Sequence, residues 1–118
     1  MKLEVGMYVR TNDGYINKIK NVNQYNVLVD GRDLFGEELN IPNNEIVKAS
    51  HNIIDLIEAG DYVNGLQVIE VREHLHNDIE IILTNGEFNW SFSKNESDYK
   101  IKSIVTKEQF ESMSYKIN

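Results

Sequence analysis

His74 and His76 come nearest, by residue type and spacing, to a reactive site. Side chains two residues apart on a strand share one face, and Asp78 and Glu80 keep the same parity. Imidazole and carboxylate groups are ligands of Zn²⁺, so a metal-dependent nuclease or hydrolase is one hypothesis. The alternative is a solvated hairpin tip, because Asn77 followed by Asp78 is a turn signal between two apolar segments. We favour the hairpin and expect neither a metal nor a cofactor.

Other patterns that would support catalysis are missing from the sequence. It contains no P-loop, no G-x-S-x-G, no H-E-x-x-H and no G-x-G-x-x-G motif. Ser50 and His51 are adjacent, and direct neighbours form a base-activated nucleophile only with a third group from elsewhere. The chain has no cysteine, which excludes thiolate chemistry and disulfides. We therefore expect a protein that is not an enzyme and has no catalytic residues.

An aromatic strand is the first candidate binding feature. Phe88, Trp90 and Phe92 alternate with small polar residues, so the three rings would share one face of a strand. We favour a core position for them, because aromatic rings bury a large area and a small domain needs that area. The alternative is a groove for a peptide or a nucleotide ligand. Stacking on nucleic acid would need neighbouring cations, and only Lys94 follows closely.

An acidic segment at residues 30–38, DGRDLFGEE, is the second candidate. One interpretation is a solvated loop. The other is an interaction loop, in which an apolar pair anchors a basic partner and the surrounding carboxylates face its charges. The candidate partner-binding residues are Asp30, Asp33, Leu34, Phe35, Glu37 and Glu38.

The charge of the chain limits its partners. Its 118 residues include 12 basic and 19 acidic ones, a net charge of −7, and this opposes binding to a phosphate backbone. No segment approaches the ~20 apolar residues of a membrane span. The N-terminal residues, interrupted by Glu4, Gly6 and Arg10, lack the apolar stretch of a signal peptide. We expect a soluble cytoplasmic protein that binds neither nucleic acid nor membranes.

The elements that would position these residues follow an internal repeat. Three blocks of sequence recur in the same order, about 54 to 58 residues apart. The paired blocks are LEVGMYV (3–9) with IEAGDYV (57–63), VLVDG (27–31) with IILTNG (81–86), and EIVKAS (45–50) with KSIVTK (102–107). We predict two structural copies, residues 1–56 and 57–118.

Each copy carries the signals of short strands joined by tight turns. The expected strands are residues 7–11, 15–22, 25–29 and 45–48, then 61–63, 66–75, 79–84, 87–93 and 99–105. Four dipeptides that tolerate positive φ mark expected turns: Asp13 with Gly14, Asp30 with Gly31, Asn64 with Gly65 and Asn85 with Gly86. The pattern predicts a mainly β fold of two tandem SH3-like small barrels packed together, with a single β sandwich as the alternative.

A short helix is expected to close each copy. Thr106 and Gln109 form a capping-box pattern that opens a helix at residues 107–113. In the first copy, the apolar face of residues 51–59 predicts a helix ending at Gly60. The candidate caps of that helix are Ser50 and Asn52.

Two segments resemble known proteins. The stretch EIVKASHNIIDLIEAGDYVNG and the ending YKIKSIVTKEQFESMSYKIN resemble small proteins of Firmicutes phages and prophages. The N-terminal VGMYVRTNDGYINKI resembles the opening strands of SH3-like barrels. The phage resemblance implies stoichiometric binding in the host bacterial cytoplasm, including inhibition of a host defence system, as anti-CRISPR proteins do.

Two functional hypotheses follow from these features. The first is a non-enzymatic phage or prophage inhibitor that occludes a basic surface of a host protein through the acidic segment. The second is a small β-barrel module, regulatory or virion-associated, that binds a peptide or nucleotide ligand through its aromatic residues. Exposed edge strands would also permit a homodimer.

Overall fold

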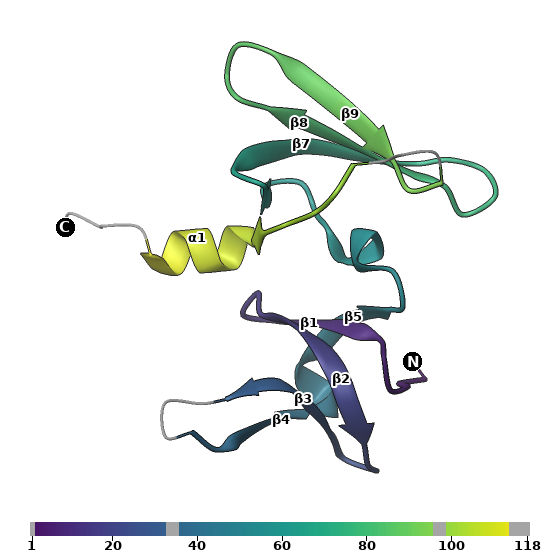
Figure 1. Cartoon of the computed structure of the whole chain (residues 1–118), viewed down its shortest axis with the longest axis vertical. Helices are drawn as coiled ribbons and strands as arrows, with labels where there is room; N and C mark the ends of the chain where they lie inside the picture. The colour runs from purple at the N-terminus through teal and green to yellow at the C-terminus, as the bar shows by residue number, and fades with distance from the viewer. Residues whose placement is uncertain (1, 33–35, 96–98, 114–118) are drawn as a thin grey trace. The chain divides into compact units, whose positions relative to one another are not determined.

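The computed structural model describes residues 2–32, 36–95 and 99–113 (Figure 1). Within these ranges the chain is mainly β, with two five-stranded antiparallel sheets and one short α-helix. The chain divides into two compact units, Met1–Leu56 and Ile57–Asn118. The prediction of a mainly β fold is confirmed. No helix in the described part of the chain is long and apolar enough to cross a membrane.

The first unit contains one sheet with the strand order β4-β3-β2-β1-β5. Its strands are β1 (Tyr8–Thr11), β2 (Ile16–Val22), β3 (Asn26–Arg32), β4 (Glu38–Pro42) and β5 (Ile46–Ser50). A 3-10 turn, η1 (Asn43–Glu45), joins β4 to β5, and a second, η2 (Ile53–Leu56), follows β5. Strand β4 was not expected from the sequence, because its segment ELNIP has only two aliphatic residues and ends in proline, which is disfavoured inside sheets.

The second unit repeats this arrangement with the strand order β10-β6-β7-β8-β9. Its strands are β6 (Tyr62–Val63), β7 (Leu66–Glu73), β8 (Ile79–Thr84), β9 (Asn89–Ser93) and β10 (Ile104–Val105), followed by the helix α1 (Lys107–Met113). In both units the first strand lies between the second and the last. The two units therefore share one topology.

The strand pairing defines which residues of the two units are equivalent. β2 pairs with β3 through a register shift between Ile19 and Asn21, and β7 pairs with β8 through the same shift between Val68 and Glu70. Five buried positions coincide in this alignment: Val9 with Val63, Ile19 with Val68, Val27 with Ile81, Val29 with Leu83, and Ile41 with Phe92. Both units thus fill their cores from the same positions.

The last block of the predicted repeat needs a correction. Ala49 pairs with Val9 in the first unit, and Ile104 pairs with Val63 in the second. Ala49 and Ile104 are therefore equivalent, and they lie 55 residues apart in the sequence. The alignment of EIVKAS with KSIVTK implied a separation of 57 residues. The sequence alignment was wrong by two residues because short strands of similar composition align equally well in registers of the same parity.

The predicted turns have three different outcomes. Asn64 and Gly65 form a two-residue hairpin with φ values of 51° and 81°, as such a turn requires, so this prediction is confirmed. Asp30 and Gly31 form no turn, because they lie inside β3 at a register shift, where Gly31 has φ 120°. A Cβ at Gly31 would meet Leu39 Cδ1 at 3.3 Å. The other two glycines lie in longer connections at positive φ: Gly14 and Gly86.

Helix α1 begins with the predicted capping box. The Gln109 N–H donates to Thr106 Oγ1 (3.3 Å), and the Thr106 N–H donates to Gln109 Oε1 (3.1 Å). Asp61, which is fully buried, accepts the N–H of Lys107 through Oδ1 (3.0 Å) and that of Glu58 through Oδ2 (2.8 Å). This carboxylate therefore satisfies one donor of the first helical turn, which no residue within the helix can reach, and one donor of the segment before β6.

The expected helix at residues 51–59 is wrong in extent. Only Ile53–Leu56 is helical, with 3-10 geometry, and the Asp55 N–H donates to the carbonyl three residues back, at Asn52 (3.0 Å). Asn52 is a cap, since its Oδ1 accepts the Ile54 N–H at 3.1 Å. The helix stops early because the Leu56 carbonyl accepts Arg10 Nη1 (2.9 Å) and the Gly60 N–H donates to the Val68 carbonyl (2.8 Å), so the next helical hydrogen bond does not form.

Candidate functional site

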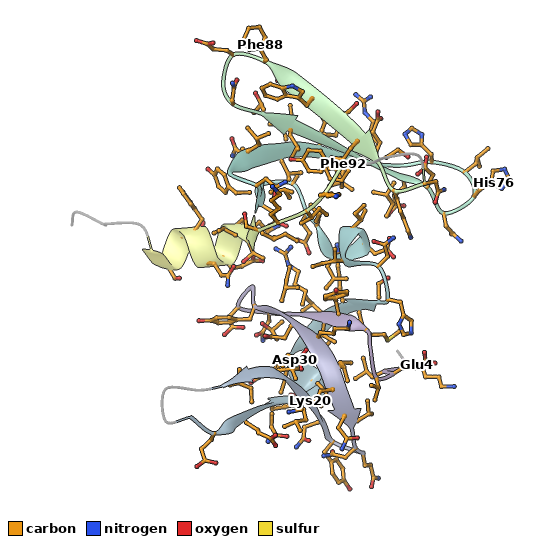
Figure 2. All side chains as sticks on the ribbon, viewed as in Figure 1. Glu4, Lys20, Asp30, His76, Phe88 and Phe92 are labelled. Carbon is orange, nitrogen blue, oxygen red and sulfur yellow. The ribbon has the colours of Figure 1, made fainter. Side chains whose placement is uncertain are left out.

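The connection between β8 and β9 is a closed loop that presents Phe88. The Asn85 Oδ1 atom accepts the N–H groups of Glu87 and Phe88, each at 2.9 Å. The Thr84 hydroxyl donates to the Phe88 carbonyl (3.1 Å) and accepts the Gly86 N–H (3.0 Å). Because the loop satisfies its own backbone groups, it holds Phe88 at the tip of the hairpin (Figure 2).

Phe88 and Trp90 form an exposed aromatic pair. Their ring centroids lie 6.3 Å apart with an interplanar angle of 64°, an edge-to-face contact. Phe88 is 63% exposed and Trp90 45% exposed. Phe92, in contrast, is buried and stacks on Tyr99 at 4.3 Å. The core prediction is correct for Phe92 and wrong for Phe88 and Trp90, because the strand's inner face leaves the core as it approaches the loop.

The first unit shows which of these aromatic residues the fold requires. The residue equivalent to Trp90 is Leu39, which is half-buried and packs against the core of its unit. Counting back along the strand, Phe88 corresponds to the exposed Glu37. The first unit therefore carries a leucine and a glutamate where the second unit carries Trp90 and Phe88. Of the three positions, only that of Phe92 is buried in both units.

The second unit carries most of the negative charge. Residues 57–118 include six basic and eleven acidic residues, a net charge of −5. Arg72 lies 3.1 Å from Glu70, and Lys107 lies 2.9 Å from Glu58, so both cations are already in ion pairs. Glu87 is exposed beside Phe88. The aromatic pair thus belongs to a unit whose field attracts cations.

The acidic segment of the first unit occupies the equivalent connection, between β3 and β4. Asp30 and Glu37 are exposed at its two ends. Glu38 begins β4 and forms an ion pair with Lys20 at 3.1 Å, in which both side chains are more than 40% exposed, so the pair adds at most about 1 kcal/mol. Figure 2 labels Asp30 and Lys20. Three further candidates of this segment lie outside the described residues: Asp33, Leu34 and Phe35.

The histidine pair lies on a hairpin tip, as the favoured interpretation predicted. His76 and Asn77 have positive φ values of 63° and 58°, and the His74 N–H donates to the Asp78 carbonyl at 2.8 Å. His76 projects at the far end of the hairpin of β7 and β8 (Figure 2). Among the residues that the structure describes, no three His, Asp or Glu side chains are placed to hold a metal ion.

Asp78 and Glu80 have structural partners in this hairpin. The Ser93 hydroxyl donates to Asp78 Oδ1 at 2.6 Å, and the Asn95 N–H donates to the same atom at 3.1 Å. These bonds, that from Ser93 first, lower the pKa of Asp78 below its ordinary value. Glu80 Oε1 lies 3.3 Å from His74 Nε2. The carboxylates that the metal hypothesis needed therefore stabilise the hairpin and the turn after β9.

No protein-family model, curated protein or solved structure matches the chain. Equivalent residues of the two units can nevertheless be compared with each other. This comparison separates Phe88 and Trp90 from the core residues, which sequence periodicity alone had grouped with Phe92. The sequence does contain a sign of this difference, because the first unit has Leu39 where the second has Trp90. The two residues can be compared only when the alignment of the two units is known from the strand pairing.

Proposed function

We propose that the chain is a non-enzymatic binding protein that occludes a basic surface of a partner protein, with Phe88 and Trp90 as its anchor. The observation that carries the proposal is the exposure of both rings, 63% for Phe88 and 45% for Trp90, at the positions where the first unit has Glu37 and Leu39. Burying such side chains stabilises a complex by about 1.5–3 kcal/mol each. Aromatic residues are also enriched among those that dominate binding energies.

The chemistry of the site favours a partner with exposed Lys or Arg side chains. The net charge of −7 over the chain and −5 over the second unit steers a cationic protein towards the site. The face of an indole ring attracts a guanidinium or ammonium group, which gives Trp90 a specific role. The same charge opposes a phosphate backbone, so a protein is a better partner than a nucleic acid.

An SH3-like barrel is the architecture that we propose for each unit. Three features support it: the last strand pairs with the first, the second strand bends at a register shift, and in the first unit a 3-10 turn precedes the last strand. Barrels of this kind present binding residues on their strand connections. The connection of β8 and β9 is such a position.

We further propose that the chain is encoded by a phage or prophage. In the bacterial cytoplasm it would inhibit a host defence protein, as anti-CRISPR proteins do. The resemblance of residues 45–65 and 99–118 to phage proteins supports this setting. The carboxylates of Asp30, Glu37 and Glu38 are a second candidate contact with the basic partner. That contact is the weaker of the two, because Glu38 is already paired with Lys20.

The proposal is tested by affinity capture from a lysate of a low-GC Firmicutes host, at low and then moderate salt. The variants Trp90→Leu and Phe88→Glu introduce the residues that the first unit carries at these positions. Tyr25→Ser is the matched control, because it removes an aromatic ring that is 73% exposed in the first unit.

We expect a basic protein that is retained by the wild type and by Tyr25→Ser, is released by salt, and is lost with Phe88→Glu. Equal capture by Phe88→Glu and the wild type would contradict the proposed site. Capture of no basic protein by the wild type would contradict the proposed function as a whole.

A further inference from the structure

Two asparagines in the chain precede glycine, Asn64 and Asn85. This sequence favours deamidation, because glycine has no Cβ to shield its backbone nitrogen, and asparagine is among the heat-labile residues. The nitrogen of the glycine attacks Cγ of the asparagine side chain. Whether the reaction occurs in a folded protein depends on how freely the asparagine and its turn can move.

Asn64 is held from both ends of its side chain by a distant segment. Its Nδ2 donates to the Lys100 carbonyl (2.8 Å), and its Oδ1 accepts the N–H groups of Lys102 (2.7 Å) and Ser103 (3.0 Å). The Asn64 N–H also donates to the Ser103 carbonyl at 3.0 Å. Asn64 can move only if residues 100–103 detach from the hairpin of β6 and β7.

Asn85 is exposed, and it forms hydrogen bonds with residues of its own loop. Its Oδ1 accepts the N–H groups of Glu87 and Phe88, two and three residues away. The loop can therefore open without breaking the β8–β9 ladder, and such local openings need little free energy.

We propose that Asn85 is a site of spontaneous deamidation, and that Asn64 is protected from the same reaction. A bond forms between the Gly86 nitrogen, which loses its proton, and Asn85 Cγ, while the bond from Cγ to Nδ2 breaks and ammonia leaves. Solvent water then hydrolyses one of the two C–N bonds of the cyclic imide. The product is aspartate or, when the original backbone bond breaks, isoaspartate.

The reaction changes the loop that presents Phe88. Isoaspartate lengthens the backbone by one methylene group between residues 85 and 86, and either product adds a negative charge next to Gly86. The N–H groups of Glu87 and Phe88 then lose the geometry that Asn85 Oδ1 gave them. If the proposed function holds, deamidation limits the lifetime of the binding site; the chemical reaction itself does not depend on that function.

The test is incubation of the full chain in mildly alkaline buffer, followed by peptide mass mapping of both asparagines. We expect deamidated product at Asn85 to exceed that at Asn64 by at least about tenfold, which a difference of about 1.4 kcal/mol in the free energy of local opening produces. The same chain unfolded in denaturant is the control, in which both sites should react at similar rates. The variant Asn85→Ser retains a side-chain acceptor for the loop and should remove the product.

Equal modification of the two sites in the folded chain, or faster modification of Asn64, would overturn the proposal. So would an unmodified Asn85 in a folded chain whose denatured control reacts. Because mass mapping needs no partner, these results are independent of the capture experiment. The variant Asn85→Asp then separates the two effects on capture, since it adds the charge without lengthening the backbone.

Discussion

The aromatic residues of β9 are expected to differ sharply in their contribution to stability. Phe92 is 5% exposed and stacks on Tyr99, so Phe92→Ala should lower the free energy of unfolding by about 3–5 kcal/mol. The second unit has 62 residues, for which total stabilities of about 3–9 kcal/mol are usual. This single substitution would therefore remove much of the unit's stability.

Trp90→Leu should have a much smaller effect, of about 1 kcal/mol or less. Trp90 is 45% exposed, and the equivalent residue of the first unit is Leu39, which packs against its core. In the same way, Phe92→Ile introduces the residue found at the equivalent Ile41 and should recover part of the loss caused by Phe92→Ala, because an aliphatic residue of similar volume is tolerated best.

Urea unfolding of the full chain, followed by far-UV circular dichroism, measures these differences. Trp90 is the single tryptophan of the chain, so its fluorescence reports on the second unit alone in the Phe92 variants. A Trp90→Leu variant that loses as much stability as Phe92→Ala would refute the reasoning. In that case Trp90 would be a core residue, and its exposure would carry no functional meaning.

Three further outcomes are expected. Asp61→Ala should cost about 3 kcal/mol or more in thermal unfolding, because it removes a fully buried carboxylate and leaves two N–H groups without their acceptor; a loss below about 1 kcal/mol would contradict this assignment. Gln109→Ala should lower the stability of helix α1 by about 1 kcal/mol, because it removes one half of the capping box. A variant that loses its helical circular dichroism signal at the same temperature as the wild type would contradict this. Asp78 has a lowered pKa, so its stabilising effect is present above the ordinary carboxyl pKa of 3.8 and is lost as the pH falls through the lowered value. Ser93→Ala should raise the pKa of Asp78 in an NMR titration, and no change would exclude the hydroxyl as the main cause.

The sequence predicted best those features that depend on local chemistry. The Asn64–Gly65 hairpin follows from two residues that tolerate positive φ, and the capping box follows from a side-chain exchange between Thr106 and Gln109. Neither feature needs information from elsewhere in the chain. The hairpin tip at His74 and His76 followed for the same reason.

The features that the sequence did not predict depend on pairing across the sheet. Asp30 and Gly31 have the composition of a turn. However, β3 continues past them and pairs with β4 on both sides, so the two residues lie at an irregularity within the strand. The helix expected at residues 51–59 ends at Leu56, because the Leu56 carbonyl pairs with Arg10 and the Gly60 N–H pairs with Val68. Local propensity contains neither fact, since each is decided by distant partners.

The candidate site was only half predictable for the same reason. Alternation places Phe88, Trp90 and Phe92 on one face of a strand, but it does not say how far along the strand the core extends. That limit depends on the register with β8, in which Ile81 faces Phe92 and Leu83 faces Trp90. In the acidic segment, the sequence did not predict that Glu38 forms an ion pair with Lys20, because Lys20 lies on another strand.

Quenching of Trp90 fluorescence by acrylamide, with and without the captured partner, tests the proposed binding site most directly. Trp90 is the single tryptophan and is 45% exposed, so the quencher should reach it readily in the chain alone. The partner should lower the quenching constant several-fold, and Tyr25→Ser should behave as the wild type does. If the quenching constant stays unchanged while the partner is bound, Phe88 and Trp90 do not form the binding site.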